Sequence, residues 1–368
     1  MSVPRFEVLR TDAGGARLGR LTLAHGVVDT PAFMPVATHG SVKGVTPAQL
    51  EEVGATIVLS NAYHLAQRPG VEVVAALGGV HGLMSWPRPI LTDSGGFQVM
   101  SLAGLVTVDD EGVRYRSHVD GRRGLLRPED AVAAQETLGV DVAMSLDECV
   151  PAAAPPAVVA RAVARTTAWA SRGLAARRRR DMALFGIVQG GLDSTQRAAS
   201  AAALIPLGFD GYAVGGLSVG ESREETTRVA AETVRMLPAV APRYLMGMGT
   251  PRDLLTFAGL GYDLFDCVLP TRNARNGMLF TRQGRLMIRN ARHVRDPRPA
   301  DESCTCYTCG HFSRGALRHL VLAKEMLGAQ LATLHNLHFY LTLMREIRDD
   351  LAAGTFPSRA RAAAGAWA

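Results

Sequence analysis

Residues 262–272 read Tyr262-Asp263-Leu264-Phe265-Asp266-Cys267-Val268-Leu269-Pro270-Thr271-Arg272, an apolar β-type run that closes on a carboxylate and enters a proline-containing loop. Burying an unpaired charge is costly, so Asp266 at the end of this run requires an explanation. One explanation is a structural ion pair between Asp266 and Arg272, and the other is that Asp266 faces a functional site. The motif alone leaves both open.

The same pattern occurs along most of the chain. Eight apolar runs alternate with Ala-rich segments typical of helices, and they cover residues 32–37, 56–60, 89–92, 141–146, 183–188, 211–215, 243–246 and 262–265. After every run but the first comes a polar residue or a glycine, namely Asn61, Asp93, Asp147, Gln189, Gly216, Gly247 and Asp266. Capping boxes predict helix starts at Thr46 with Gln49 and at Ser222 with Glu225.

Eight strands with crossover helices over roughly 240 residues predict an α/β fold, a closed (β/α)8 TIM barrel. A doubly wound open sheet is the alternative, because one miscounted strand would change the assignment. Barrel enzymes assemble their sites at the carboxyl ends of all strands, whereas an open sheet uses mainly its switch point. Polar ends on nearly every run therefore favour the barrel.

Two stretches interrupt the βα alternation. Between about residues 104 and 127, alternating valines and the Asp120-Gly121 turn predict a small antiparallel insertion. After Gly277, residues 278–280 and 286–288 predict a hairpin, followed by a cysteine cluster and a helix over about 331–351. We therefore expect a catalytic barrel over 1–276, a zinc-binding subdomain over 277–351 packed on it, and a flexible tail over 352–368.

The composition is that of an ordinary globular protein with a mild basic excess. Forty basic and thirty-four acidic residues give a formal net charge of +6 and a pI near 9.3, which weakly favours polyanionic partners. The run Arg177–Arg180 is interpreted as a solvated face beside a helix end, with a smaller chance of a phosphate contact. No apolar run reaches the ~18 residues of a membrane span, and no signal sequence is recognised at the N-terminus. We expect a cytoplasmic location.

Cys304, Cys306 and Cys309 place three thiolates within six residues, a donor set suited to tetrahedral zinc. The candidates for the fourth ligand are His311, His319, His335 and His338. His311 is so close in sequence to Cys309 that it would close a strained ring, whereas His335 would fasten the C-terminal helix to the hairpin. Spacing favours His335, and a filled shell of three cysteines and a histidine indicates structural Zn²⁺, one per subunit. Three free cysteines on a loop are the alternative.

The strand ends also predict a reacting site. Asp93, Asp147 and Asp266 would converge at one barrel mouth, where mutual repulsion raises the pKa of at least one of them or requires a cationic substrate. Two opposed carboxylates suit chemistry at a sugar anomeric carbon, where one attacks and the other moves protons. The glycines around Phe97 and at Gly215-Gly216 allow a flat ligand to approach the backbone, although both are also ordinary tight turns.

Five motifs together resemble the tRNA-guanine transglycosylase family, also called queuine tRNA-ribosyltransferases. They are residues 93–99 (DSGGFQV), 145–149 (SLDEC), 186–190 (GIVQG), 215–220 (GGLSVG) and 265–272 (FDCVLPTR). The zinc spacing with His335 matches as well, and the resemblance extends in unbroken order from about Phe6 to Leu351. The resemblance implies a barrel enzyme that exchanges guanine at the tRNA wobble position for a 7-deazaguanine, on the way to queuosine.

The resemblance also implies roles for single residues. It makes Asp266 the nucleophile that forms a covalent intermediate with ribose, and Asp93 the general acid/base. Its substrate-binding positions correspond to Asp93, Ser94, Phe97, Asp147, Gln189, Gly216, Leu217 and Met246, with Phe97 and Met246 sandwiching the ring. Arg272 and Arg275 resemble the arginines that contact the anticodon.

The implied partners are tRNA with a GUN anticodon, guanine and the 7-deazaguanine preQ1, and the family resemblance suggests a homodimer. Cys149 with Val219 resembles the bacterial pattern that takes preQ1, whereas relatives that take queuine carry a smaller residue at the position of Val219. The in-vivo base and the oligomeric state are left open by the sequence itself.

Two other classes of function compete with this interpretation. The chain would be a non-catalytic tRNA-binding subunit if it kept the fold without turnover, although it retains both Asp93 and Asp266. It would be a zinc-dependent barrel hydrolase if mild chelation removed activity while the fold stayed intact. Formation of a covalent RNA adduct would exclude the non-catalytic subunit. Loss of folded structure on chelation would exclude the zinc-dependent hydrolase.

Overall fold

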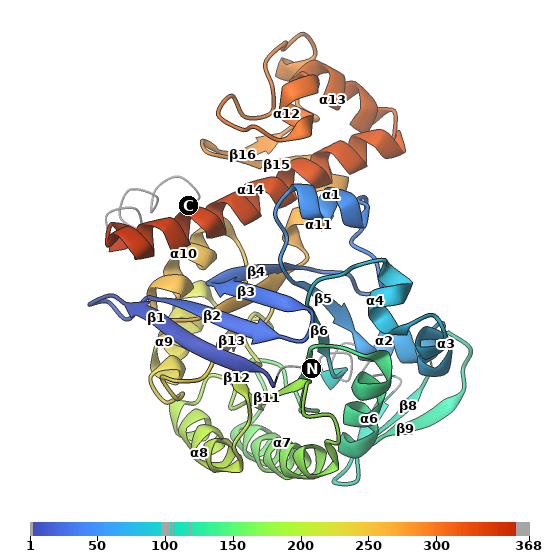
Figure 1. Cartoon of the computed structure of the whole chain (residues 1–368), viewed down its shortest axis with the longest axis vertical. Coiled ribbons are helices and arrows are strands. Elements are labelled where there is room, and N and C mark those ends of the chain that lie inside the picture. The colour runs from blue at the N-terminus through green and yellow to red at the C-terminus, as the bar shows by residue number, and fades with distance from the viewer. Residues whose placement is uncertain (1–2, 97–103, 105, 118, 358–368) are drawn as a thin grey trace.

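The computed structural model describes residues 3–96, 104, 106–117 and 119–357, and a parallel β-barrel lies at its centre (Figure 1). The barrel strands are β4 (Ala32–Pro35), β5 (Val58–Asn61), β6 (Ile90–Asp93), β10 (Val142–Met144), β11 (Ala183–Val188), β12 (Gly211–Val214), β13 (Arg243–Leu245) and β14 (Leu264–Cys267). Their order in the sheet is β4-β14-β13-β12-β11-β10-β6-β5. A single parallel bridge, Val36 to Leu59, nearly closes the ring between β4 and β5.

The pairing of the last strand with the first decides the topology. β14 pairs with β4 in parallel, with Phe265 opposite Phe33 and Asp266 opposite Met34. A doubly wound sheet would leave these two strands unpaired with each other. The (β/α)8 prediction is therefore confirmed, and each of the eight predicted runs overlaps one barrel strand.

Helices surround the barrel as the alternating pattern predicts. They are α1 (Pro47–Glu52), α2 (Ala62–Gln67), α3 (Val71–Ala76), α4 (Gly79–Met84), α6 (Pro128–Leu138), α7 (Pro156–Ala176), α8 (Ser194–Leu204), α9 (Arg223–Val234), α10 (Pro251–Gly259) and α11 (Leu269–Arg275), with a short 3-10 turn at Ile205–Leu207. Both predicted capping boxes form, because the side chains of Thr46 and Ser222 accept from the third helical amide in α1 and α9. A third capping box, Thr250 with Asp253, starts α10.

The barrel interior is a separate apolar core. Inward-facing side chains such as Met34, Met144 and Phe185 form one buried cluster, and outward-facing ones pack against the helices in a second. Alternation along each strand produces these two layers, because successive side chains of a strand point to opposite faces. The interior is thus filled, and only the strand ends are open to a ligand.

An antiparallel sheet that the sequence reading did not anticipate covers the amino-terminal end of the barrel. Its strands are β1 (Arg5–Thr11), β2 (Arg17–Leu23) and β3 (Gly26–Thr30). Leu21, Leu23 and Val28 belong to the barrel-interior cluster. Arg17 and Asp263, both buried, form an ion pair, and Arg17 Nε donates to Asp263 Oδ1 at 2.9 Å. Ligands therefore enter from the opposite end, at the carboxyl ends of the strands.

The predicted antiparallel insertion is present. It consists of β7 (Val106–Val108), β8 (Val113–Arg116) and β9 (Arg123–Leu126) in that order. Val113 packs with Leu146 and Trp169 in a small cluster, which fastens the insertion to the outside of the barrel.

The C-terminal part begins with the predicted hairpin, β15 (Met278–Thr281) and β16 (Gly284–Met287). A 3-10 turn at Ala291–His293 follows, then α12 (Tyr307–His311), α13 (Arg314–Leu322) and α14 (Met326–Ala353). Figure 1 shows α14 running between this hairpin region and the barrel. Its first turns join the cluster of Leu279 and Leu317, and its later residues join the large core around the barrel.

The C-terminal helix is longer than the sequence suggested. α14 begins at Met326 rather than near residue 331 and ends at Ala353 rather than near 351. Phe356 is 3% exposed and belongs to the large core, so packed structure extends into the segment expected to be a tail. The reason is that Phe356 is an apolar anchor that packs on Gly259 of α10. Residues 358–368 lie outside the described part of the chain.

Within the described residues, no helix combines the length and apolar character needed to cross a membrane.

Candidate active site

The predicted site residues lie at the carboxyl ends of the barrel strands. Asp93 is the last residue of β6, and Asp266 lies in β14. Asp147, Gln189, Gly216 and Met246 follow the ends of β10, β11, β12 and β13, within three residues in each case. Phe97, the predicted stacking residue, lies outside the described residues.

Asp266 is held by two hydrogen bonds. Its Oδ1 accepts from the Tyr244 hydroxyl and from the Gly247 amide, both at 2.7 Å. Burial raises its pKa, while these two donors act in the opposite direction because they stabilise the charged form. None of the ion pairs among the described residues links Asp266 to Arg272, whose side chain is exposed. The ion-pair explanation for Asp266 is therefore wrong.

Asp93 has a different environment. Its Oδ1 is buried and has no hydrogen-bond partner within the part of the chain that the structure describes. Burial raises the pKa of Asp93 well above its usual range, and the negative charges of Asp266 and Asp147 raise it further, whereas a hydrogen bond with the Asn61 side chain lowers it. Asn61 is the β5 residue that pairs with Asp93 in the parallel ladder.

The charge of Asp266 raises the pKa of Asp93, so the two carboxylates titrate as a pair. The surroundings favour a shared proton on Asp93, since Asp266 has two donors that favour its ionised form and Asp93 Oδ1 has none. The arrangement thus favours one ionised and one protonated carboxyl group at the barrel mouth.

A second group of polar side chains adjoins this pair. Gln189 Nε2 donates to Asp147 Oδ2 at 2.6 Å, and Gln189 Oε1 is buried without a partner among the described residues. Burial raises the pKa of Asp147 to about 6. Both side chains therefore have hydrogen-bonding capacity that a planar ligand with complementary donors and acceptors would use.

Two glycines bring the backbone against these side chains. A Cβ on Gly96 would lie 1.8 Å from Asp147 Oδ1, and one on Gly216 would lie 2.3 Å from Gln189 Oε1. Gly216 also has a φ of +65°, which side chains rarely adopt. Ser94 and Leu217 are buried beside these loops, and Met246 is half-buried. The backbone of these loops thus lies directly against the Asp147 and Gln189 side chains, and we call this group of loops and side chains the slot.

Arg272 and Arg275 lie on α11, the helix that directly follows β14. Both side chains are exposed, and Arg275 Nη1 donates to the Thr271 carbonyl at 2.8 Å. Burial lowers the pKa of Arg275, and the charge of Arg272 lowers it further, so the two guanidinium groups are neighbours. They supply positive charge next to the strand end that carries Asp266.

Three residues that contact the site were not identified from the sequence. Tyr244 bonds Asp266, Asn61 bonds Asp93, and the buried Arg197 of α8 donates to the Gly215 and Gly216 carbonyls. The inward alternation along Arg243–Leu245 is the signal that would have indicated Tyr244. No comparable sequence signal exists for Arg197, because its partners are backbone atoms.

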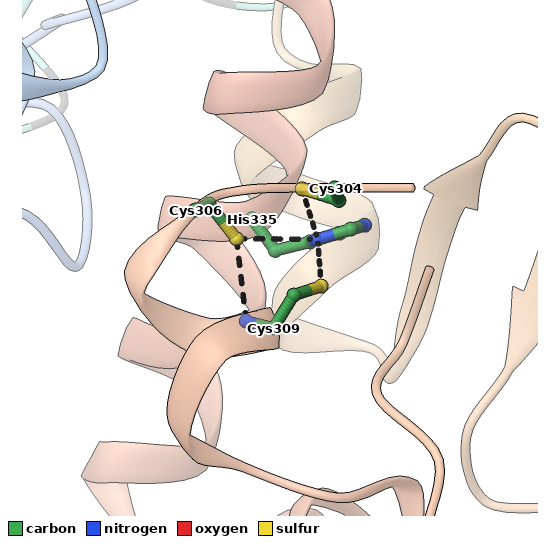
Figure 2. Close-up of side chains that lie close together, drawn as sticks. All are labelled: Cys304, Cys306, Cys309 and His335. Atoms are coloured by element: carbon green, nitrogen blue, oxygen red, sulfur yellow. Dashed lines mark hydrogen bonds between the residues drawn. The ribbon is translucent and has the colours of Figure 1, made fainter. Parts of the chain in front are cut away.

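The predicted zinc cluster is confirmed. Cys304, Cys306, Cys309 and His335 place one ligand atom each within 4.8 Å of the others (Figure 2). His335 Nδ1 lies 3.7, 3.6 and 3.3 Å from the three Sγ atoms in chain order. Tetrahedral zinc sets nitrogen–sulfur separations of roughly 3.6 Å, so the donor set and spacing fit a structural zinc ion.

The surroundings of the cluster also fit a metal site. His335 Nε2 lies 2.8 Å from the Phe280 carbonyl oxygen, the outer partner that orients a metal-bound imidazole. His338 lies closer to the cluster than expected, because its Nδ1 is 3.5 Å from Cys304 Sγ. His311 and His319 are exposed outside the cluster.

Comparison with known proteins agrees with the geometry. A family model described as queuine tRNA-ribosyltransferase matches residues 12–368. A queuine tRNA-ribosyltransferase of Aromatoleum aromaticum is 53% identical over 358 residues, covering 97% of this chain and 96% of the relative. One from Thiobacillus denitrificans is 52% identical over 352 residues, and one from Azoarcus sp. is 53% identical over 354, each covering at least 95% of both chains. The chain therefore belongs to the queuine tRNA-ribosyltransferase family and is an enzyme of that family, a tRNA-guanine transglycosylase.

Proposed function

We propose that this chain replaces guanine at wobble position 34 of tRNAs with a GUN anticodon by the 7-deazaguanine preQ1, as a step of queuosine biosynthesis. The observation that carries the proposal is the pair of buried carboxylates at the barrel mouth. Of the two, Asp266 has two hydrogen-bond donors and Asp93 Oδ1 has none. Such a pair provides the nucleophile and the acid that substitution at an anomeric carbon needs.

The first displacement breaks the bond between guanine and ribose. An oxygen of Asp266 attacks C1′ of the ribose and forms an ester-like covalent bond, while the electrons of the C1′–N9 bond pass to the departing base. Asp93 gives its proton to a nitrogen of that base, so guanine leaves neutral. The hydrogen bonds from Tyr244 and Gly247 hold Asp266 in position for the attack.

The second displacement reverses these roles. The incoming 7-deazaguanine loses a ring proton to Asp93, and its nitrogen attacks C1′ and releases the Asp266 carboxylate. Both enzyme groups return to their starting protonation states. Two inversions give net retention of configuration at C1′.

The slot beside Asp93 and Asp266 recognises the base. Asp147 is an acceptor for the N1–H and exocyclic amine of a guanine-type edge, and Gln189 with the Gly216–Leu217 backbone pairs with its carbonyl side. We assign Ser94, Met246 and Phe97 to the walls that enclose the ring. The narrow glycine-lined geometry supports a flat, bicyclic ligand.

The RNA has to present its target base outside a helical stack. A single-stranded anticodon loop permits this at low cost. Arg272 and Arg275, exposed on α11 beside Asp266, are the proposed contacts for neighbouring nucleotides. Cys149 and Val219 support preQ1 rather than the bulkier queuine, because relatives that take queuine carry a smaller residue at the position of Val219. We further propose a homodimer that works in the cytoplasm.

A base-exchange assay tests the proposal. The enzyme is incubated with tRNA bearing a GUN anticodon and with labelled guanine, preQ1 or queuine in parallel, and label entering RNA is counted. We expect guanine and preQ1 to be incorporated and queuine not. Incorporation of queuine at the rate of preQ1 would overturn the assignment of the base, and incorporation into a tRNA with another anticodon nucleotide at position 34 would overturn that of the RNA.

A further inference from the structure

A fully buried arginine lies behind the loops that form the base slot. Arg197 of α8 is 0% exposed, and the acceptors of its hydrogen bonds within the described residues are all backbone carbonyl oxygens. Nη1 donates to Val188 O at 3.0 Å and to Gly215 O at 2.8 Å, Nη2 to Gly216 O at 3.3 Å, and Nε to Gly191 O at 3.0 Å. Burial lowers the pKa of Arg197 to about 10, so it remains a cation at neutral pH.

These acceptors belong to the two loops that carry the proposed base contacts. Val188 directly precedes Gln189, and Gly215 and Gly216 form the neighbouring loop after β12. Ser200, one turn along α8 from Arg197, accepts from the Gln189 amide at 3.2 Å. One face of α8 therefore fixes the backbone on both sides of the slot.

The orientation of the glycine peptides follows from these bonds. In a trans peptide the N–H points opposite to the C=O, so fastening the Gly215 and Gly216 carbonyls to Arg197 turns the Gly216 and Leu217 amides away from it. The Gly216 amide indeed hydrogen-bonds the thiol of Cys149, which belongs to the same motif, residues 145–149, as Asp147. Reversing either peptide would leave a buried carbonyl without a donor, which is unfavourable.

We propose that Arg197 is a positioning residue for base recognition, which holds the Gly215–Gly216–Leu217 backbone so that its amides, rather than its carbonyls, face the incoming base. The inference rests on the proposed function of the slot. It adds that Arg197 decides which backbone hydrogen-bond donors the slot offers to the base. Only a planar guanidinium serves four carbonyls at once, because its five N–H groups diverge in one plane, whereas an ammonium has three donors at a single point. Arg197 contacts neither reacting carboxylate through a hydrogen bond among the described residues.

The test compares Michaelis constants for the two substrates. Arg197→Lys keeps the positive charge and removes the planar guanidinium group. Arg197→Gln keeps two N–H donors and removes the charge. In both variants we expect KM for preQ1 to rise roughly ten- to a hundredfold, the size of effect that a small displacement of contacts produces, with KM for tRNA unchanged. If turnover is too slow, equilibrium dialysis of preQ1 measures the same loss of affinity.

Two further variants serve as controls for this comparison of Michaelis constants. Arg17→Lys alters an arginine that is equally buried at the other end of the barrel and also donates to carbonyls, those of Ala239 and Ala241, at 2.7 Å. It should lower the melting temperature without changing KM for preQ1. Asp147→Asn should raise KM for preQ1 by itself.

The outcomes separate the two claims. If Asp147→Asn raises KM for preQ1 and the Arg197 variants do not, or if the Arg197 variants raise both Michaelis constants equally, the positioning role is wrong and the proposed slot stands. If Asp147→Asn leaves KM for preQ1 unchanged, the assignment of the slot fails and the role of Arg197 fails with it.

Discussion

Asp93 and Asp266 are the same residue type at the same barrel mouth, and their neighbours favour different protonation states. Tyr244 and Gly247 donate to Asp266, whereas the buried Oδ1 of Asp93 has no partner among the described residues. Hydrogen bonds stabilise the charged form of Asp266, and repulsion between like charges disfavours the charged form of Asp93. The pKa values of two identical side chains can therefore differ. The first prediction below tests the hydrogen bond to Asp266, and the second tests the buried charge of the neighbouring Asp147.

Tyr244→Phe removes one donor to the ionised Asp266. A hydrogen bond to a charged group contributes ~1.5–3 kcal/mol, so kcat should fall about ten- to a hundredfold. In the proposed mechanism activity requires ionised Asp266, so it should be lost as pH falls through the pKa of Asp266. Removing the donor raises that pKa, so the acid limb of the kcat–pH profile should move to higher pH.

The matched control is Tyr212→Phe. Tyr212 is also buried on a barrel strand, but its hydroxyl donates to the Ile205 carbonyl at 3.1 Å, away from the carboxylate pair. Its pH profile should be that of the unchanged enzyme. An acid limb that stays in place in Tyr244→Phe would contradict the role given to this hydrogen bond.

Asp147→Asn should stabilise the fold at alkaline pH while it weakens base binding. The folded pKa is raised from its usual 3.8 to about 6 by burial, so the associated stability is present below pH 3.8 and is lost as pH rises through 6. Each pKa unit corresponds to ~1.4 kcal/mol, so the buried charge costs ~3 kcal/mol at pH 8. Urea unfolding should show the variant more stable at pH 8 and equal to the parent near pH 4. A variant that is less stable at both pH values would refute this.

At the scale of elements, the sheet β1–β3 closes one end of the barrel and the zinc cluster holds the C-terminal helices. Each uses a few polar groups to fix where an apolar surface docks. The sheet uses the buried pair Arg17–Asp263, and the C-terminal part uses three thiolates and one imidazole. Disrupting either set should therefore have a local structural effect before it has a chemical one.

Arg17→Met should lower the free energy of unfolding by ~3–5 kcal/mol, because it leaves Asp263 buried and uncompensated. Adding Asp263→Asn should recover a large part of that loss, since the unpaired charge is then removed. Arg20→Met is the matched control on the same strand, because Arg20 pairs with Asp29 at the surface and such pairs contribute ~0–1 kcal/mol. Equal losses in Arg17→Met and Arg20→Met would show that the buried pair has no special role.

His335→Ala should abolish stoichiometric zinc and loosen the C-terminal part of the chain. The expected sign is rapid proteolysis between about Gly277 and Leu341, with the same cleavage in the parent after chelation. Structural zinc contributes directly to folding energy, so the loss should be local and large. His311→Ala is the control, since His311 is exposed and bonds only Tyr307 O at 2.8 Å among the described residues. If chelation left proteolysis unchanged, the zinc ion would not be structural.

At the scale of the whole molecule, the barrel was predictable because its strands repeat one signal. Nearly every run is followed by a polar residue or glycine, and the capping residues Thr46 and Ser222 mark helix starts between the runs. The sheet β1–β3 was not anticipated, since β1 has mostly exposed side chains and shows little apolar pattern. Its docking depends on contacts between Arg17 and Asp263, which are far apart in sequence.

The site was predictable only to the level of residue type and strand end. Asp266 and Asp93 stood out as charges after apolar runs, but Tyr244 and Arg197 act through contacts that fold topology creates. The arginine run at 177–180 shows the same limit. Arg178 and Arg180 are exposed, as expected for a solvated face, whereas Arg177 donates to Asp210 at 2.6 Å. A partner as distant in sequence as Asp210 leaves no local sequence pattern.

The central claim is that Asp266 forms a covalent bond with ribose. The enzyme is incubated with an anticodon stem-loop RNA and 9-deazaguanine, which stalls the second displacement, and is then run on a denaturing gel. We predict an RNA–protein band with the parent enzyme and none with Asp266→Asn, although that variant still shifts the RNA on a native gel. A band of equal intensity from Asp266→Asn, or no band from the active parent enzyme, would contradict the account.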